Sequence, residues 1–97
     1  MRERDIESYL VKRAKALGGE VRKVKWIGRR GAPDRLLMLP SALMLRTGLS
    51  STVWVELKAP GEKAKPHQIR EHKRMRRMGQ RVEVIDSIEK VMELLND

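Results

Sequence analysis

One segment decides how this 97-residue chain folds, and it reads Thr52-Val53-Trp54-Val55-Glu56-Leu57-Lys58. Apolar and polar character alternate along it, which is the pattern of a β-strand whose two faces meet different surroundings. The two valines and Leu57 share one face, while Trp54, Glu56 and Lys58 share the other. We therefore expect a strand over residues 52–58 with one buried side and one side that carries charged groups.

The rest of the sequence surrounds this strand with helices and further strands. Apolar spacing and β-forming residues predict a helix, three strands, a helix, a strand and a helix, over residues 4–17, 20–27, 34–39, 52–58, 66–78, 81–85 and 88–95. The order αβββαβα predicts an α/β fold in which helices flank a mixed central sheet. We expect a single domain over residues 1–97.

The segment between the second and third strands, residues 40–51, fits neither periodicity. Its part from 43 to 49 is too apolar for a solvated loop and is hard to bury within a chain this short. Two interpretations stay open. The segment covers one end of the sheet, or it forms an interface with a second copy of the chain.

The composition favours a polyanionic partner. Lys and Arg number 22 against 13 for Asp and Glu, which leaves a formal charge of +9. Aromatic residues make up 3% of the chain, too few for a surface on which successive bases stack. A solvated basic face is the alternative interpretation for the second helix. The charge predicts contacts with nucleic-acid phosphates through Arg22, Lys23, Lys25, Arg29, Arg30, Arg70 and Arg74.

Two absences narrow the function classes. The chain has no cysteine, which excludes a disulfide framework, a thiolate zinc site and a cysteine nucleophile. No apolar run approaches the roughly 20 residues of a membrane span, and the charged N-terminus lacks the apolar region of a signal peptide. We expect an intracellular, cytoplasmic protein with no membrane partner.

Two acidic residues lie at strand positions that adjacent strands would bring together. Asp34 follows Gly31-Ala32-Pro33 and begins the second strand, and Glu56 lies on the third. Two carboxylates at close range repel unless a cation lies between them, and hard oxygen ligands favour Mg²⁺ or Mn²⁺. Lys58 faces the same way as Glu56 and is placed to orient or deprotonate a water. Taken singly, these features also fit a surface ion pair and an ordinary loop.

This Pro-Asp…Glu-x-Lys arrangement resembles the PD-(D/E)XK nuclease superfamily, and more closely its VRR-NUC (virus-type replication-repair nuclease) family. The matching features are Glu7 in the first helix, Gly31-Ala32-Pro33-Asp34, Val55-Glu56-Leu57-Lys58 and Gln68 in the second helix. The similarity spans roughly residues 4 to 95. It implies a restriction-endonuclease-like domain.

The resemblance also implies roles for the residues of the two strands. Asp34 and Glu56 would be metal-binding carboxylates with catalytic roles, and the Leu57 carbonyl would supply a further oxygen ligand. Lys58 would be the catalytic lysine. The implied cofactor is Mg²⁺ or Mn²⁺.

Two helical residues complete the implied site. Glu7, which apolar spacing places in the middle of a face with Leu10, Val11 and Ala14, would reach the metal directly or through water. Its alternative role is that of an acid favoured near a helix N-terminus. Gln68 would take part in catalysis by holding Lys58 or the water. We expect His72, on the same helix face as Gln68, to be a packing residue or to support a ligand.

Together these features predict a metal-dependent, structure-specific DNA endonuclease. The resemblance implies cleavage of branched DNA, such as four-way (Holliday) junctions or flaps, by a homodimer. Two other classes stay open. One is a non-catalytic basic DNA-binding protein, and the other is a nuclease subunit that is active only within a larger complex.

Overall fold

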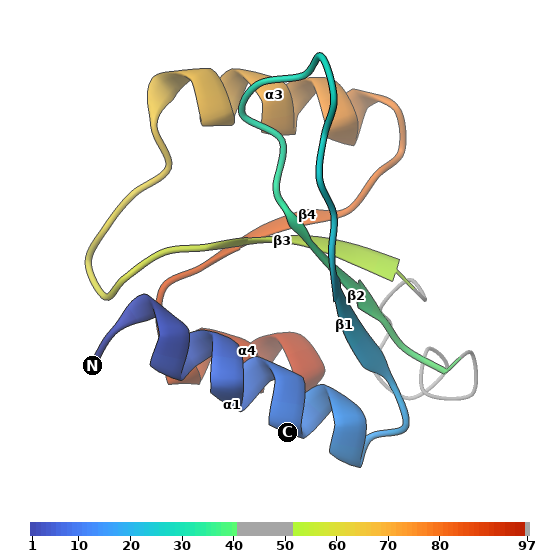
Figure 1. Cartoon of the computed structure of the whole chain (residues 1–97), viewed down its shortest axis with the longest axis vertical. Helices are drawn as coiled ribbons and strands as arrows, with labels where there is room; N and C mark the ends of the chain where they lie inside the picture. The colour runs from blue at the N-terminus through green and yellow to red at the C-terminus, as the bar shows by residue number, and fades with distance from the viewer. Residues whose placement is uncertain (41–51, 97) are drawn as a thin grey trace.

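The computed structural model describes residues 1–40 and 52–96, and its element order is the predicted αβββαβα (Figure 1). The elements are α1 (Glu3–Ala16), β1 (Glu20–Lys23), β2 (Arg35–Met38), β3 (Thr52–Leu57), α3 (Pro66–Arg77), β4 (Val82–Ile85) and α4 (Ile88–Leu95). The α/β fold class is therefore confirmed. The predicted interface or covering role of residues 43–49 lies outside the described residues.

The strands form a four-stranded mixed sheet in the order β1-β2-β3-β4. β1 and β2 pair antiparallel, β2 and β3 pair antiparallel, and β3 and β4 pair parallel. The parallel pair needs a crossover, which α3 supplies. In the β2–β3 register, Arg35 lies opposite Val55 and Leu36 lies opposite Trp54.

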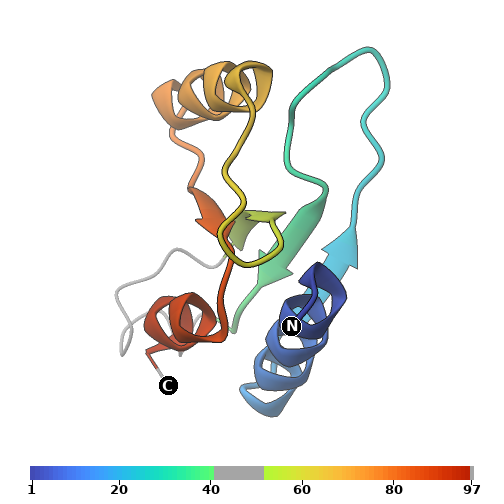
Figure 2. The same ribbon diagram turned by 90° about the vertical axis from the view of Figure 1, so that its left-hand side faces the viewer.

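The helices lie on both faces of the sheet. α1 and α4 cover one face, and α3 lies on the other (Figures 1 and 2). Val53, Val55 and Leu57 join the hydrophobic core on the α1 and α4 side, as their alternation predicts. The opposite face of β3, with Trp54 and Glu56, therefore lies on the side of α3.

The buried stripe of α1 differs from the predicted one. Ile6, Leu10 and Ala14 are fully buried, while Val11 is 38% exposed. These buried residues are spaced by four, so the stripe follows one ridge of the helix. The ridge is centred one position before Glu7, because α1 packs against both the sheet and α4. Glu7 thus lies at the edge of the apolar face, and the prediction that it lies in the middle is wrong.

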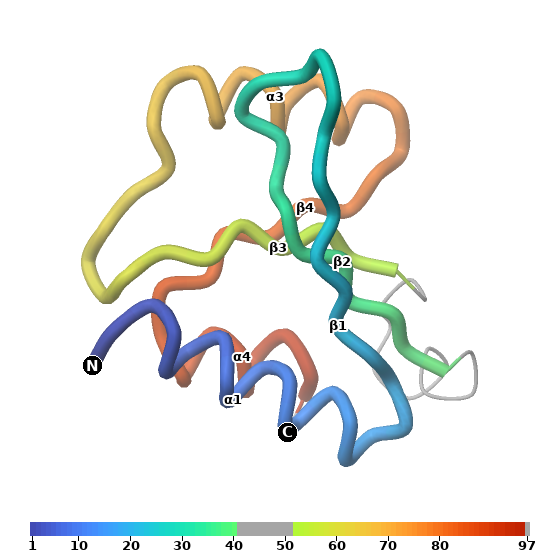
Figure 3. Tube along the Cα trace, viewed as in Figure 1, coloured from blue at the N-terminus to red at the C-terminus, as the bar shows by residue number. Residues whose placement is uncertain are grey.

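Between β1 and β2 the chain leaves the sheet as a long loop, residues 24–34. The predicted strand over residues 20–27 is therefore shorter in the structure, since β1 ends at Lys23. One further hydrogen bond joins the loop ends, from the Val24 N–H to the Asp34 carbonyl at 2.9 Å. Beyond it, Gly28 and Gly31 adopt positive φ and turn the chain. The loop rises beside α3 (Figures 2 and 3).

The helices are short and mostly charged on their outer faces. The longest helix among the described residues, α1, has 14 residues. Across residues 1–40 and 52–96, none of the helices has the length and apolarity needed to cross a membrane.

Candidate functional site

Asp34 and Glu56 meet at the end of the β2–β3 pairing. Arg35 lies opposite Val55, so the same register carried one pair further places Asp34 opposite Glu56. Side chains directly opposite on antiparallel strands have Cβ atoms about 5 Å apart. The Asp34 side chain is 62% exposed, whereas that of Glu56 is 10% exposed. The pair therefore joins a solvent-facing carboxylate to a buried one.

Burial dominates the chemistry of Glu56. The pKa of its carboxyl group is raised to about 7, chiefly by desolvation; the charge of Lys58 opposes the shift, and the nearby charges of Asp34 and Glu3 add to it. A carboxyl group with such a pKa exchanges its proton near neutral pH. A bound cation would favour its ionised form.

His72 holds the Glu56 carboxyl group from α3. The His72 side chain is 2% exposed, and its Nε2 lies 3.2 Å from Glu56 Oε1. Burial and the charge of Arg76 lower the pKa of His72, so the imidazole is neutral at neutral pH. The contact is thus a hydrogen bond rather than an ion pair. The sequence-based expectation for His72, packing or ligand support, agrees with this position.

Lys58 lies just beyond the end of β3 and is also buried, at 9% exposure. Its N–H donates to the Ile85 carbonyl at 2.9 Å, which continues the β3–β4 pairing. Its positive charge lowers the pKa of Glu56, so the two side chains interact electrostatically. The structure therefore brings together Asp34, Glu56 and Lys58.

Glu7 reaches the edge of this group through Arg35. The Arg35 Nε donates to Glu7 Oε2, and its Nη1 lies 2.9 Å from Asp34 Oδ1. Arg35 thus joins α1 to the second strand and lies between two of the predicted metal ligands. Sequence reasoning missed this residue. Its signal is a cation directly after Asp34 in an otherwise apolar strand.

The two facing carboxylates, Asp34 and Glu56, are oxygen donors of the kind that a hard divalent cation prefers. Mg²⁺ is usually held by one or two protein carboxylates and completes its shell with water, so Asp34 and Glu56 are sufficient protein ligands. In the described ranges, 1–40 and 52–96, no group of three or more His, Cys, Asp or Glu side chains is arranged to hold a metal ion. Contributions from Glu7 and the Leu57 carbonyl remain predictions.

Gln68 lies at the beginning of α3, close to the loop that carries Asp34. Its Oε1 accepts a hydrogen bond from the Lys65 N–H at 2.8 Å, which caps the helix. A Cβ on Gly31 would lie 2.8 Å from the His67 carbonyl oxygen and 3.2 Å from the Gln68 Cα. Glycine is therefore needed for the loop to approach α3 this closely. The catalytic role of Gln68 remains a prediction.

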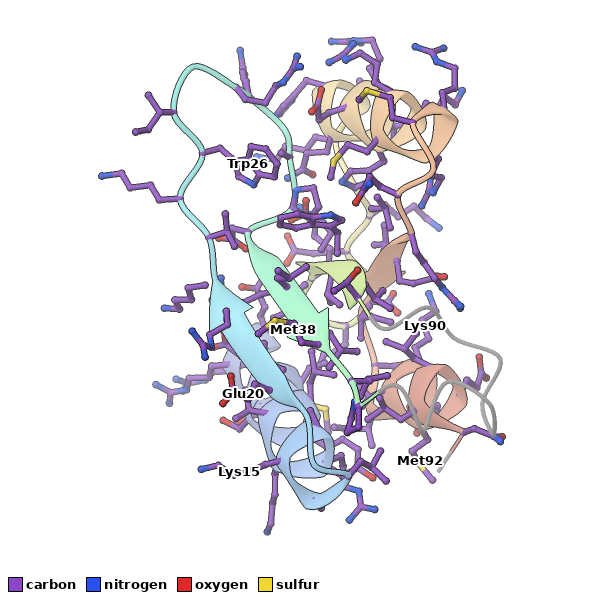
Figure 4. All side chains as sticks on the ribbon, turned by 90° about the vertical axis from the view of Figure 1, so that its right-hand side faces the viewer. Lys15, Glu20, Trp26, Met38, Lys90 and Met92 are labelled. Atoms are coloured by element: carbon purple, nitrogen blue, oxygen red, sulfur yellow. The ribbon has the colours of Figure 1, made fainter. Side chains whose placement is uncertain are left out.

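Two tryptophans support the segment before Asp34. Trp26 points inward across the loop (Figure 4), and its Nε1 donates to the Pro33 carbonyl at 2.9 Å. Its ring centroid lies 5.2 Å from that of Trp54, whose Nε1 donates to Gln80 at 3.0 Å. Trp54 thus packs against Trp26 within the protein. Trp26 fixes the backbone next to Asp34, a role that sequence reasoning missed.

A buried acid joins the cations of the 24–34 loop to those of α3. Glu71 of α3, with a side chain that is 3% exposed, lies 3.3 Å from Arg29 and 2.7 Å from Arg74. The loop and α3 therefore present their cations on adjoining surfaces. Sequence reasoning missed Glu71 too, although it is the single acid among the many cations of this helix.

The other predicted nucleic-acid contacts lie on the surface. Arg22 pairs with Glu20 on β1, with Nε 2.9 Å from Oε2. Four further cations are exposed, namely Lys23, Lys25, Arg30 and Arg70. Binding of DNA by the predicted set of cations remains a prediction.

The mixed sheet, the facing acids and the neighbouring lysine define the class of protein, a nuclease-type domain of the PD-(D/E)XK superfamily. A solved structure described as a VRR_NUC domain matches with a TM-score of 0.79 at 39% identity, covering 97% of this chain and 94% of that one. The chain belongs to the VRR-NUC family.

Sequence comparison agrees with this assignment. The protein named "Putative nuclease p44", from Acyrthosiphon pisum secondary endosymbiont phage 1, is 44% identical over 87 residues. The match covers 90% of this chain and 85% of that protein. No protein-family model matches the chain.

Proposed function

We propose that this protein is a divalent-metal-dependent endonuclease that hydrolyses DNA phosphodiesters. The observation that carries the proposal is the meeting of Asp34, Glu56 and Lys58 at one end of the sheet, beside a surface rich in cations. Family membership supports hydrolysis of nucleic acid, and the named relative is described as a nuclease.

The residues divide the proposed reaction between them. Asp34 and Glu56 hold Mg²⁺ or Mn²⁺, with Glu7 and the Leu57 carbonyl as further ligands, and His72 keeps the Glu56 carboxyl group in position. The bound cation supplies Lewis-acid stabilisation of the phosphate and a more acidic water. Lys58 neutralises the charge that develops on the phosphate as water attacks phosphorus. Gln68 orients Lys58 or the water.

Branched DNA is the proposed substrate. Phosphate contacts position a protein on DNA without reading its sequence, so the exposed cations favour recognition of shape. Flaps and four-way junctions differ from plain duplex in the path of their phosphates. We further infer that the protein acts as a homodimer, because a four-way junction suits an enzyme with two symmetric active sites.

The test compares a labelled four-way junction, a flap and plain duplex in Mg²⁺, Mn²⁺ or EDTA. We expect cleavage of the branched substrates with either metal and none in EDTA. Asp34→Ala and Lys58→Ala should each lower the cleavage rate by at least about a hundredfold, since both remove groups that act in the transition state. Met92→Ala, an exposed change on α4, is the matched control.

Each contrary result has a distinct meaning. Cutting in EDTA would overturn the metal mechanism, and full activity of either variant would overturn the assignment of that residue. Retarded DNA without cleavage under any condition would favour a non-catalytic binding protein. Weak cleavage that rises strongly with an added partner would favour a subunit of a larger complex.

A further inference from the structure

The loop over residues 24–34 carries a large apolar side chain in full contact with water. Ile27 is 93% exposed, more than Met1 at 74% or Met78 at 65%. Isolated exposed apolar side chains are common on protein surfaces, so exposure alone assigns no role. Two further features give Ile27 a role: the contacts that hold the loop and the charges that surround this side chain.

Contacts on both sides of Ile27 fix the loop. Before it, the Trp26 indole donates to the Pro33 carbonyl at 2.9 Å across the loop. After it, Arg29 pairs with the buried Glu71 of α3 at 3.3 Å, and Gly31 packs against the His67 backbone. A loop held on both sides presents Ile27 outward rather than leaving it free to fold back onto the core. Ordering this loop in advance also lowers the entropy cost of binding.

The charges near Ile27 select the kind of partner. Lys25 and Arg30 are exposed within three residues of Ile27 on either side. DNA has charged phosphates on its outside and apolar stacked bases inside. The cations beside Ile27 therefore suit the phosphates, and the Ile27 side chain suits the base stack. Isoleucine is among the side chains that DNA-binding proteins insert between base steps.

We propose that Ile27 is a wedge that enters the DNA base stack where a branch interrupts the duplex; this inference rests on the proposed nuclease function. Separating bases costs least where stacking is already disturbed, so a wedge favours a junction or flap over plain duplex. Ile27 is therefore a specificity-determining residue rather than a catalytic one.

The experiment compares wild type with Ile27→Ser, Ile27→Leu and the matched exposed control Met78→Ser. Single-turnover rates are measured in Mg²⁺ on a flap and on plain duplex, with Asp34→Ala as the inactive reference. Ile27→Ser should lower the flap-to-duplex rate ratio by about tenfold, because it removes the apolar insertion and keeps the charge. Ile27→Leu should retain the ratio, and Met78→Ser should leave it unchanged.

A second measurement keeps the wedge testable without turnover. In EDTA, 2-aminopurine at the branch point should brighten when wild type or Ile27→Leu binds, and should not brighten with Ile27→Ser. If Ile27→Ser leaves the flap-to-duplex rate ratio unchanged, including by lowering both rates equally, the wedge proposal is overturned. Cleavage that still depends on Asp34 would in that case continue to support the nuclease function. Absence of cleavage by wild type overturns the nuclease, and the fluorescence result then decides the wedge by itself.

Discussion

Burial raises the pKa of the Glu56 carboxyl group to about 7, so in the absence of metal the group is partly protonated at neutral pH. Metal ligands must be deprotonated, so proton and cation compete for this side chain. His72 lies against the same carboxyl group and stays neutral because its own pKa is lowered. Glu56, one of the predicted metal ligands, is thus also a residue whose ionisation is opposed by its burial.

The first prediction concerns the stability of the metal-free protein. The pKa of Glu56 is raised from 4.5 to about 7 in the folded state, so its favourable contribution is complete below pH 4.5 and is lost as pH rises through 7. Glu56→Gln, which cannot ionise, should therefore become more stable relative to wild type over that range. After allowance for solvent screening, the gain should be about 1 to 3 kcal/mol.

Urea unfolding in EDTA at a series of pH values measures this difference. His72 contributes a slope of opposite sign, since its lowered pKa gives stability above pH 6.5 that is lost as pH falls, and it is present in both proteins. Glu83→Gln, a change at a half-buried position on β4, is the control. A constant difference between Glu56→Gln and wild type across the range would contradict the prediction.

At the scale of elements, the loop over residues 24–34 and helix α3 act as one unit. Gly31 allows their backbones to meet, and Glu71 pairs with cations from both. These contacts cross between segments about 40 residues apart in the chain. These contacts depend on the position of α3 over the sheet. The sequence periodicity of the loop and of α3 does not specify that position.

A second prediction follows for Glu71→Gln. Charge alone predicts tighter DNA binding, because the variant removes a negative charge from a basic surface. We expect the opposite, a loss of about threefold to tenfold in affinity, because Arg29 and Arg74 lose the ion pairs with Glu71 that position them.

Fluorescence anisotropy with labelled flap DNA in EDTA measures this affinity. Glu83→Gln is again the control, since it removes the same charge from a half-buried pair with Arg81 on another element. Circular dichroism checks that each variant is folded. Tighter binding by folded Glu71→Gln would show that Glu71 acts only as a local negative charge.

The facing acids were predictable from sequence, and the contacts around them were not. Alternation along β3 and the position of Asp34 at a strand start suffice to place Asp34 and Glu56 together once β2 and β3 are neighbours. Arg35, Trp26 and Glu71 escaped prediction because their partners come from other elements. The packing of α1 against both the sheet and α4 likewise decided that Ile6 rather than Glu7 faces the core.

At the scale of the whole molecule, the proposed homodimer gives a third prediction. A chain of 11.2 kDa should behave in solution as a particle of twice that mass, because a symmetric junction favours paired active sites. Light scattering coupled to gel filtration measures the mass, with and without a four-way junction. A monomer mass under both conditions would overturn the dimer while leaving the chemistry of one active site intact.

The contact between Trp26 and Trp54 gives the molecule an optical property of its own. These are the two tryptophans of the chain, and their ring centroids lie 5.2 Å apart. One ring belongs to the loop that precedes Asp34, and the other belongs to the strand that carries Glu56. Excitonic coupling between two neighbouring indoles depends on their separation and angle, here 5.2 Å and 47°, so near-ultraviolet circular dichroism will register any movement of the loop relative to the sheet. The protein therefore needs no added label to report when this end of the sheet opens or closes.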